Sequence, residues 1–289
     1  MNILTDRIQE LSRPLEPLPT GTALCLKPLD DIDTVLFDIY GTLLISGSGD
    51  VGTAAATDSS EALVQSLIVS GYEGDHERAG ELGPGLLRTE IEHWHEIARD
   101  AGTDYPEVEI SRVWKKLIQR FQSLEILKHD DDPMRIERLA VEYECRVNPV
   151  WPMPAAQSTI ENLQARGFRL GIVSNAQFYT PLIMETLFGK PLEELGFEPN
   201  LCVFSYKALR AKPSIELFQT LETKTDWSKT LYVGNDMLND IWTASQVGCR
   251  TCLFAGDRRS LRLRKKDKHC KHLAADAVVD HLHQITEMV

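Results

Sequence analysis

A short apolar run that ends on an acidic residue constrains this chain more than any other feature. Residues 35–44 read Val-Leu-Phe-Asp-Ile-Tyr-Gly-Thr-Leu-Leu. A strand that is covered on both faces is apolar throughout, so the run predicts a buried strand of a parallel sheet. Asp38 follows that strand at its carboxyl end, where open α/β sheets bind their ligands, and Gly41 permits a sharp turn beside it. A single acid at such a place is usually only solvated, so its interpretation depends on the rest of the chain.

Three further segments place polar residues at predicted strand ends or just before a helix. Residues 168–175 form an apolar run that ends in a hydroxyl and an amide, and residues 230–236 form one that ends in an acid. Between them, a Lys-Pro pair precedes a helix-like run over residues 214–221. The polar residues of these segments are Ser174, Asn175, Lys212, Asp236 and Asp240.

The acidic residues among them predict a metal site. Asp38, Asp236 and Asp240 would bring three carboxylates to one edge of the sheet, with Lys212 as the only obvious cation. Like charges at close range cost energy or raise the pKa of the groups that carry them. Mg²⁺ removes that cost, because it binds one or two carboxylates together with waters and the phosphate oxygens of a substrate. The pattern therefore favours attack by a carboxylate nucleophile on a charged centre, through a covalent intermediate.

Taken in order, the four segments resemble the motifs of the haloacid dehalogenase (HAD) superfamily, over residues 33–46 and about 150–280. The resemblance implies an α/β fold with a doubly wound parallel sheet, a Rossmann-like HAD core, and an inserted helical cap. It also assigns roles to single residues. By this resemblance the catalytic residues are Asp38 (the nucleophile), Tyr40, Ser174 and Lys212, the phosphate-binding residues are Thr42, Ser174, Asn175 and Lys212, and the Mg²⁺ ligands are Asp38, the Tyr40 carbonyl oxygen, Asp236 and Asp240.

The first motif departs from that of the superfamily's phosphatases at one position. Those enzymes usually have a second acid two residues after the nucleophile, and it protonates the leaving group and later activates water. This chain has Tyr40 there, and a phenol with a pKa of about 10 cannot act as that base at neutral pH. Asp-x-Tyr-Gly-Thr resembles instead the L-2-haloacid dehalogenases, which attack carbon and need no metal. His93 or His95 of the cap is a hypothetical replacement for the missing base.

The leading hypothesis is a hydrolase, a Mg²⁺-dependent phosphatase acting on a small phosphorylated metabolite. One alternative is a metal-independent 2-haloacid dehalogenase, and another is a weakly active or non-catalytic protein that binds a phosphorylated ligand or partner. In the fourth motif, either Asn235 or Asp236 could occupy the first metal position, and Asp236 is favoured because a carboxylate binds Mg²⁺ better than an amide does. Asp240 is expected to begin a helix.

Apolar periodicity divides the chain into an extension, a core and a cap. Residues 1–30 are interpreted as an N-terminal extension, residues 31–46 and 150–289 as the core domain, and residues 47–149 as the cap domain. Within the cap, helices are predicted over residues 59–70, 86–100, 110–124 and 133–146.

The composition is that of a soluble globular enzyme, with 43% hydrophobic and 26% charged residues. An excess of 43 acidic over 31 basic residues argues against a general nucleic-acid surface, and no apolar run is long enough to span a membrane. The first nine residues lack the apolar stretch of a signal peptide, so a cytoplasmic location is expected. A small molecule is the expected partner, and the oligomeric state is not predicted. The basic run over residues 258–272 is expected to be a surface segment.

Overall fold

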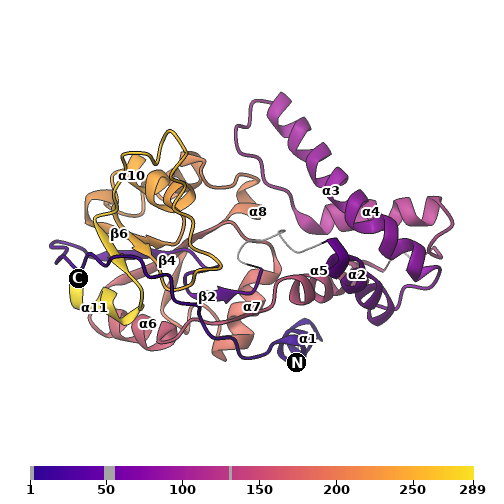
Figure 1. The fold of residues 1–289 in the computed structure, drawn as a ribbon, viewed down its shortest axis with the longest axis horizontal. Coiled ribbons are helices and arrows are strands. Elements are labelled where there is room, and N and C mark those ends of the chain that lie inside the picture. Colours follow the sequence, from indigo (N-terminus) through magenta and orange to yellow (C-terminus); the bar gives the residue numbers. More distant parts are fainter. Residues whose placement is uncertain (1–2, 49–55, 130–131) are drawn as a thin grey trace.

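Figure 1 shows the computed structural model, which describes residues 3–48, 56–129 and 132–289. Its core is a six-stranded sheet with parallel pairings, in the order β5-β4-β1-β6-β7-β8. The chain fills one half of the sheet with β1, β4 and β5 and the other half with β6, β7 and β8, so the winding reverses beside β1. The predicted doubly wound α/β fold is confirmed. The strands are β1 (Thr34–Phe37), β4 (Arg169–Ser174), β5 (Phe197–Phe204), β6 (Thr230–Gly234), β7 (Arg250–Phe254) and β8 (Ala277–Val279).

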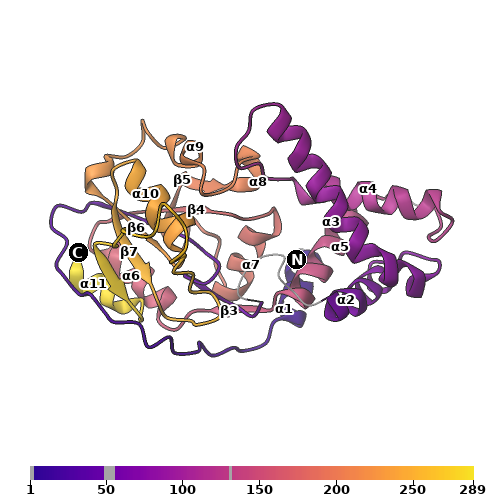
Figure 2. The same cartoon turned by 45° about the horizontal axis from the view of Figure 1, so that its top comes forward.

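Both faces of β1 are buried because its side chains alternate between two apolar layers. Val35 and Phe37 belong to the larger core cluster, whereas Leu36 packs with Tyr232 and Phe218 on the other face. The first layer includes side chains of α6 (Ala156–Ala165), α7 (Tyr179–Phe188) and α11 (His283–Met288), and the second includes those of α9 (Ile215–Gln219) and α10 (Thr243–Gln246). Helices therefore cover the sheet on both sides, as Figure 2 shows.

Four helices lie together to one side of the sheet, and we call them the cap (Figures 1 and 2). They are α2 (Ala56–Val69), α3 (His76–Asp100), α4 (Ile110–Ser123) and α5 (Pro133–Val147). Two short antiparallel strands, β2 (Leu44–Ser46) and β3 (Val150–Pro152), connect the cap to the core. Of the helices in the described part of the chain, none is long and apolar enough to cross a membrane.

The longest cap helix, α3, begins at His76 and not after Pro84, where the apolar periodicity begins. The Asp75 carboxylate caps it by accepting a hydrogen bond of 3.0 Å from a backbone N–H of the first turn. Pro84 lies inside the helix, and Gly83 faces α2 so closely that an added Cβ would lie 2.1 Å from Leu63 Cδ2. Gly83 thus serves close packing and Pro84 is accommodated inside the helix, although both residue types ordinarily disfavour helices, which is why the sequence pattern underestimates the length of α3.

The N-terminal segment joins the cap side of the molecule to the far edge of the sheet. Helix α1 (Ile3–Leu11) packs against α5 and α7. The chain then runs along the core to β8, where Cys25 exchanges backbone hydrogen bonds of 2.9 and 3.0 Å with Val278 (Figure 2). The backbone N–H of Leu29 donates to the carbonyl oxygen of Met288 at 2.7 Å, which fastens the segment to the last helix.

Glu142 carries the polar contact between α1 and the cap. Its buried carboxylate accepts hydrogen bonds from Arg7 Nε at 2.5 Å and Arg7 Nη2 at 3.2 Å, and it also pairs with Arg146. Burial raises the pKa of Glu142, but the guanidinium groups of Arg7 and Arg146 lower it by more.

Glu142→Gln should therefore lower the free energy of unfolding at pH 7 by about 1.5–3 kcal/mol, the range for hydrogen bonds to charged groups. Because the pKa of Glu142 is depressed in the folded protein, its contribution is present above the usual value of 4.5 and is lost as the pH falls through the folded value. Urea unfolding of both proteins at neutral and acid pH measures this, and the difference should shrink in acid. Glu10→Gln removes the exposed partner of Arg7 and is the control, with an expected change below about 0.5 kcal/mol. If the difference in the free energy of unfolding does not vary with pH, the pKa of Glu142 is not depressed by its ion pairs.

Candidate active site

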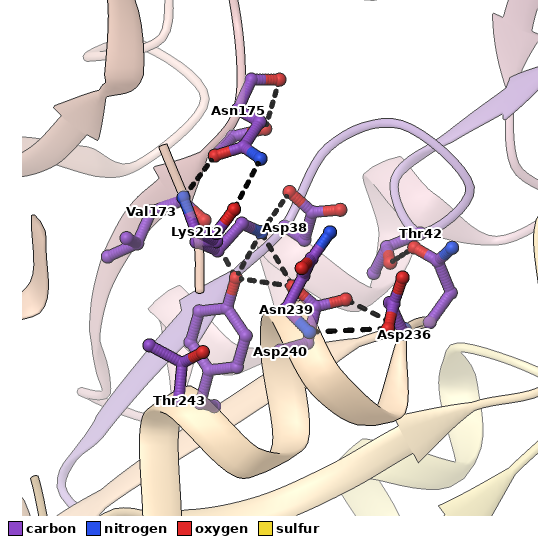
Figure 3. Close-up of polar contacts among 12 residues, drawn as sticks. Asp38, Thr42, Val173, Asn175, Lys212, Asp236, Asn239, Asp240 and Thr243 are labelled. Atoms are coloured by element: carbon purple, nitrogen blue, oxygen red, sulfur yellow. Dashed lines mark hydrogen bonds and ion pairs between the residues drawn. The ribbon is translucent and has the colours of Figure 1, made fainter. Parts of the chain in front are cut away.

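The candidate catalytic residues meet at the carboxyl edge of three adjacent strands, β4, β1 and β6 (Figure 3). Asp38 follows β1 directly, Asn175 follows β4, and Asn235 follows β6. The winding of the sheet reverses beside β1, and open α/β sheets bind ligands in the crevice at such a reversal. The structure thus places these residues at the edge of the sheet that the sequence indicates.

Lys212 links two of the three acidic residues. Its ammonium donates hydrogen bonds to Asp38 Oδ1 at 2.8 Å, to Asp240 Oδ1 at 2.6 Å and to the hydroxyl oxygen of Tyr232 at 2.9 Å (Figure 3). These bonds use all three N–H donors of the ammonium, and only 3% of the side chain is exposed. Asp38 and Asp240 therefore share one buried cation.

The positive charge of Lys212 does not fully offset the effect of burial on the pKa of Asp240. Burial lowers the pKa of Lys212, but Asp240 and Asp38 raise it by more, so the ammonium stays charged. Burial, with smaller contributions from the charges of Asp38 and Asp236, raises the pKa of Asp240 to about 7 against the lowering effect of Lys212. An additional cation beside Asp240 would stabilise the charged form of this carboxyl group.

Asp236, the third acid expected to bind metal, has other partners. Its Oδ2 accepts hydrogen bonds from Arg264 Nε at 3.0 Å and Nη2 at 2.6 Å, and its Oδ1 accepts bonds of 2.8 and 3.2 Å from the backbone N–H groups of Leu238 and Asn239. Asp236, and not Asp240, thus caps the helical segment η2 (Met237–Trp242), so the expectation that Asp240 begins a helix is wrong. Within residues 3–48, 56–129 and 132–289, no three His, Cys, Asp or Glu side chains gather closely enough to hold a metal ion. Asp236 lies next to the pair of carboxylates at Lys212, since its backbone N–H donates to Asp240 Oδ2 at 2.8 Å, but its own carboxylate pairs with Arg264.

Arg264 reaches Asp236 because its segment pairs with the fourth motif through the backbone. The N–H of Arg262 donates to the carbonyl oxygen of Asn235 at 3.0 Å, and the N–H of Met237 donates to the carbonyl oxygen of Arg262 at 2.8 Å. The basic run over residues 258–272 is thus more than a surface segment, since it brings a second cation to the site.

Asn235 and Thr42 stabilise the turn that follows Asp38. Thr42 Oγ1 donates to Asn235 Oδ1 at 3.1 Å, and Asn235 Nδ2 donates to the carbonyl oxygen of Ser260 at 2.7 Å. Gly41 has a φ of +83°, and an added Cβ there would lie 2.8 Å from Asn235 Nδ2, so only glycine suits this turn. The Thr42 side chain is fully buried, so its hydroxyl serves the turn.

Asn175 positions Lys212 through the main chain. The N–H of Lys212 donates to Asn175 Oδ1 at 2.7 Å, and Asn175 Nδ2 donates to the carbonyl oxygen of Lys212 at 3.3 Å. Asn175 also lines the cavity described below, whereas the neighbouring Ser174 is fully buried and does not.

Tyr40 is buried beside the nucleophile position. Its hydroxyl lies 2.9 Å from Thr180 Oγ1, and burial, followed by the nearby Glu144, raises its pKa well above the usual value of 10.0. Tyr40 therefore cannot supply a base at neutral pH. His93 and His95 do not line the cavity, which gives no support to either as the replacement.

A cavity of about 500 Å³ lies between these residues and the cap. Its core side is polar, with Asp38, Asn175, Lys212 and Asp240 in the wall, and its cap side is largely apolar. The size suits a small molecule. The sequence patterns did not single out several of its polar lining residues, namely Glu107, Glu144, Gln177 and Asn239.

Gln177 and Glu107 connect the cap to the core across this cavity. Gln177 Nε2 donates to the carbonyl oxygen of Val108 at 2.8 Å, and the N–H of Ile110 donates to Gln177 Oε1 at 3.0 Å. Glu107 Oε2 accepts a hydrogen bond of 2.8 Å from Ser205 Oγ. Each of these contacts joins residues that are far apart in the sequence, so no local pattern could identify them.

Asp38 and Asp240 suit a divalent cation better than the full predicted set does. Mg²⁺ takes one or two carboxylates and fills its other positions with water and substrate oxygens. Two buried carboxylates, one with a raised pKa, meet that requirement, and the Tyr40 carbonyl oxygen belongs to the same turn. The ion pair with Arg264 argues against Asp236 as a ligand.

Comparison with known proteins identifies the family. The model of the haloacid dehalogenase-like hydrolases matches residues 32–248, about three quarters of the chain. The chain belongs to this family. The resemblance seen in the four motifs is confirmed, and the protein is a hydrolase of the HAD class.

Individual relatives include both phosphatases and dehalogenases. A ribulose-1,5-bisphosphate 5-phosphatase from Halopiger xanaduensis is 27% identical over 263 residues, which cover 88% of this chain and 98% of the relative. A 2-haloacid dehalogenase from Pseudomonas syringae has a similar structure, with a TM-score of 0.55 and 20% identity over 89% of this chain and 97% of the other. A HAD phosphatase from Thermococcus onnurineus gives a TM-score of 0.51 and 19% identity, with the same coverage of 89% and 97%. At these identities the two structures establish the fold alone.

Proposed function

We propose that the protein is a Mg²⁺-dependent phosphatase that uses Asp38 as its nucleophile on a small phosphate ester. The observation that carries the proposal is the buried triad of Asp38, Lys212 and Asp240 in the wall of a cavity of about 500 Å³. The similarity to a ribulose-1,5-bisphosphate 5-phosphatase supports a phosphoryl substrate.

The residues of the triad divide the work between them. Asp38 attacks phosphorus and forms an aspartyl phosphate, and Lys212 orients Asp38 through its hydrogen bond of 2.8 Å. Lys212 also neutralises charge that the transferring group brings close to two carboxylates. Asn175 keeps Lys212 in place through the two main-chain hydrogen bonds, and Tyr232 fills the third donor position of the ammonium.

A bound Mg²⁺ would be held by Asp38, Asp240 and the Tyr40 carbonyl oxygen. It would supply positive charge against the phosphate oxygens, which the chain's own cations at Lys212 and Arg264 supply only in part.

The substrate we propose is a small phosphorylated metabolite, and a sugar bisphosphate is the first to test. The cavity volume is of the size that binds such molecules, and Arg88 and Arg262 in its wall offer positive charge in addition to that of Lys212. The relative named above acts on a bisphosphate of this kind.

One observation favours a second candidate, a 2-haloacid dehalogenase. Tyr40 replaces the second acid, and Lys212 already neutralises part of the charge of Asp38 and Asp240 without a metal. In that case Asp38 would attack carbon and release halide. A non-catalytic phosphate-binding protein is the third candidate, and ligand-induced stabilisation without turnover would support it.

Phosphate release with and without Mg²⁺ tests the proposal. Suitable substrates are ribulose 1,5-bisphosphate, ribulose 5-phosphate and phenyl phosphate, with 2-chloropropionate assayed for halide release under the same conditions. The proposal expects phosphate release that EDTA abolishes and that Mg²⁺ restores. Halide release without metal, in the absence of phosphate release, would replace it with the second candidate.

The two acids of the fourth motif should respond differently to substitution. Asp240→Asn should weaken the apparent Mg²⁺ affinity and lower kcat by at least about 10²-fold, because it removes a buried metal ligand. Asp236→Asn should act mainly on stability, with a loss of about 1–3 kcal/mol from the ion pair with Arg264. Mg²⁺ titrations of activity and urea unfolding of both variants measure these effects. A large loss of Mg²⁺ affinity in Asp236→Asn alone would restore Asp236 to the metal site.

A further inference from the structure

Glu144 is a buried carboxyl group in the cavity wall for which the proposed reaction so far has no role. It lies on the cap helix α5 and lines the same cavity as Asp38. Its Oε2 accepts a hydrogen bond of 3.0 Å from the hydroxyl of Tyr179, on the core helix α7, and its Oε1 accepts one of 3.1 Å from Asn148 Nδ2. Asn148 Oδ1 in turn accepts a hydrogen bond of 2.7 Å from Ser46 Oγ in the connection to the core. The carboxyl group is therefore held from both the cap and the core.

The position of Glu144 relative to Tyr40 is informative. After burial, the charge of Glu144 is the largest influence that raises the pKa of Tyr40, so the two side chains lie within electrostatic range. Tyr40 stands two residues after Asp38, where phosphatases of this superfamily usually have their second acid. A cap carboxyl group thus lines the same cavity as Tyr40, the position where the first motif lacks its second acid.

The surroundings of Glu144 suit a group that gives and takes a proton. Burial raises its pKa, and the hydrogen bonds from Asn148 and Tyr179 lower it only in part. Each carboxyl oxygen accepts one hydrogen bond, which leaves lone-pair sites on both for a proton. A raised pKa brings a carboxyl group nearer to the working pH, as general acid–base catalysis requires.

We propose that Glu144 acts as the general acid and base that Tyr40 cannot be, an inference that rests on the phosphatase function proposed above. In the first step the Asp38 oxygen bonds to phosphorus, the bond from phosphorus to the leaving oxygen breaks, and the Glu144 proton passes to that oxygen. In the second step the Glu144 carboxylate takes a proton from water as the water oxygen attacks phosphorus. The bond from phosphorus to Asp38 then breaks, inorganic phosphate leaves, and Glu144 is protonated again.

The other acid on the cap side of the cavity, Glu107, is half-buried and provides a matched control. Burial raises the pKa of Glu107 too. However, its Oε2 accepts from Ser205 Oγ and its Oε1 accepts from the N–H of Val108, each at 2.8 Å, so it fastens a cap loop to the core. Any fall of kcat/KM in Glu107→Gln should therefore be the same for every leaving group.

The test compares two aryl phosphates of similar shape with different leaving groups. Phenolate is a strong base with a conjugate acid of pKa about 10 and needs a proton as it leaves, whereas 2,4-dinitrophenolate is a weak base and does not. For Glu144→Gln, kcat/KM for phenyl phosphate should fall by about 10²–10⁴-fold, while that for 2,4-dinitrophenyl phosphate should change by less than about fivefold. The same variant should release a burst of one dinitrophenolate per enzyme, because hydrolysis of the aspartyl phosphate is slow without Glu144 as the base.

Each outcome distinguishes this inference from the proposed function. An equal fall of kcat/KM for both substrates, as expected of Glu107→Gln, would give Glu144 a purely structural role and overturn the inference while the phosphatase function stands. If wild type hydrolyses neither aryl phosphate nor the sugar phosphates, the phosphatase function fails and this inference fails with it. Should Glu144→Gln not fold, as judged by thermal unfolding, Glu144→Asp is the second variant. Because its side chain is shorter, Glu144→Asp should lower kcat/KM for phenyl phosphate, relative to that for 2,4-dinitrophenyl phosphate, by at least about tenfold. An unchanged ratio of these two values would overturn the inference.

Discussion

Asp38→Asn should lower kcat for phosphate release by on the order of 10⁴-fold or more, because an amide cannot form the covalent phosphoryl intermediate. The fold should persist, since Lys212 keeps its hydrogen bonds of 2.6 Å to Asp240 and 2.9 Å to Tyr232. Steady-state kinetics with the best substrate of the panel measure the loss, and urea unfolding checks the fold.

The control for this substitution is Asp33→Asn. Asp33 is an exposed acid at the opposite end of the same strand, next to Thr34, and its removal should leave kcat within about twofold. If Asp38→Asn keeps more than a tenth of the wild-type kcat, Asp38 is not the nucleophile.

Lys212→Met should have the largest effect on stability among the site variants. It would leave Asp38 and Asp240 buried beside each other without their shared cation, and breaking a buried ion pair in this way costs about 3–5 kcal/mol. Burial lowers the pKa of Lys212, but the two carboxylates raise it above its unfolded value of 10.5. The contribution is therefore present in full at neutral pH and is lost only as the pH rises through the folded value.

Urea unfolding at pH 7 measures this loss, and phosphate release should vanish together with it. The double variant Lys212→Met/Asp240→Asn should recover part of the stability, because only one carboxylate then remains without a partner. Lys207→Met, at an exposed lysine of the nearby helix α8 (Ser205–Ala208), should change the free energy of unfolding by less than about 0.5 kcal/mol. Equal stability of Lys212→Met and wild type would show that the triad contributes nothing to folding.

The sequence predicts the three strands that carry the site, β1, β4 and β6, and the edge of the sheet where it lies, because both depend on local patterns. A strand such as residues 35–37 is apolar throughout, since each of its faces packs on a separate helical layer. Asp38, Asn175 and Asp240 follow such runs or lie a few residues beyond them, so parallel pairing alone brings them together. The meeting of Lys212 with Asp38 and Asp240 agrees with the set of motifs.

Residues that depend on packing between distant segments could not be predicted in this way. Arg264 binds Asp236 only because its loop pairs with the fourth motif through the backbone, and its own surroundings in the sequence indicate merely a basic surface run. Glu144 and Gln177 reach the cavity because α5 and the loop before α7 face each other across it. Their positions follow from how the cap helices pack on the core, which the helical periodicity of each segment does not specify.

The most direct test of Asp38 as the nucleophile is mass spectrometry of the protein after an acid quench within the first turnover. Each protein is mixed with excess 2,4-dinitrophenyl phosphate and Mg²⁺ and quenched in acid, and its peptides are then analysed by mass spectrometry. Nucleophilic attack by Asp38 predicts one added phosphoryl group on the peptide that contains Asp38, no such addition in Asp38→Asn, and a larger fraction of adduct in Glu144→Gln. Phosphate release at the wild-type rate with the Asp38 peptide unmodified at every quench time, in both wild type and Glu144→Gln, would contradict it.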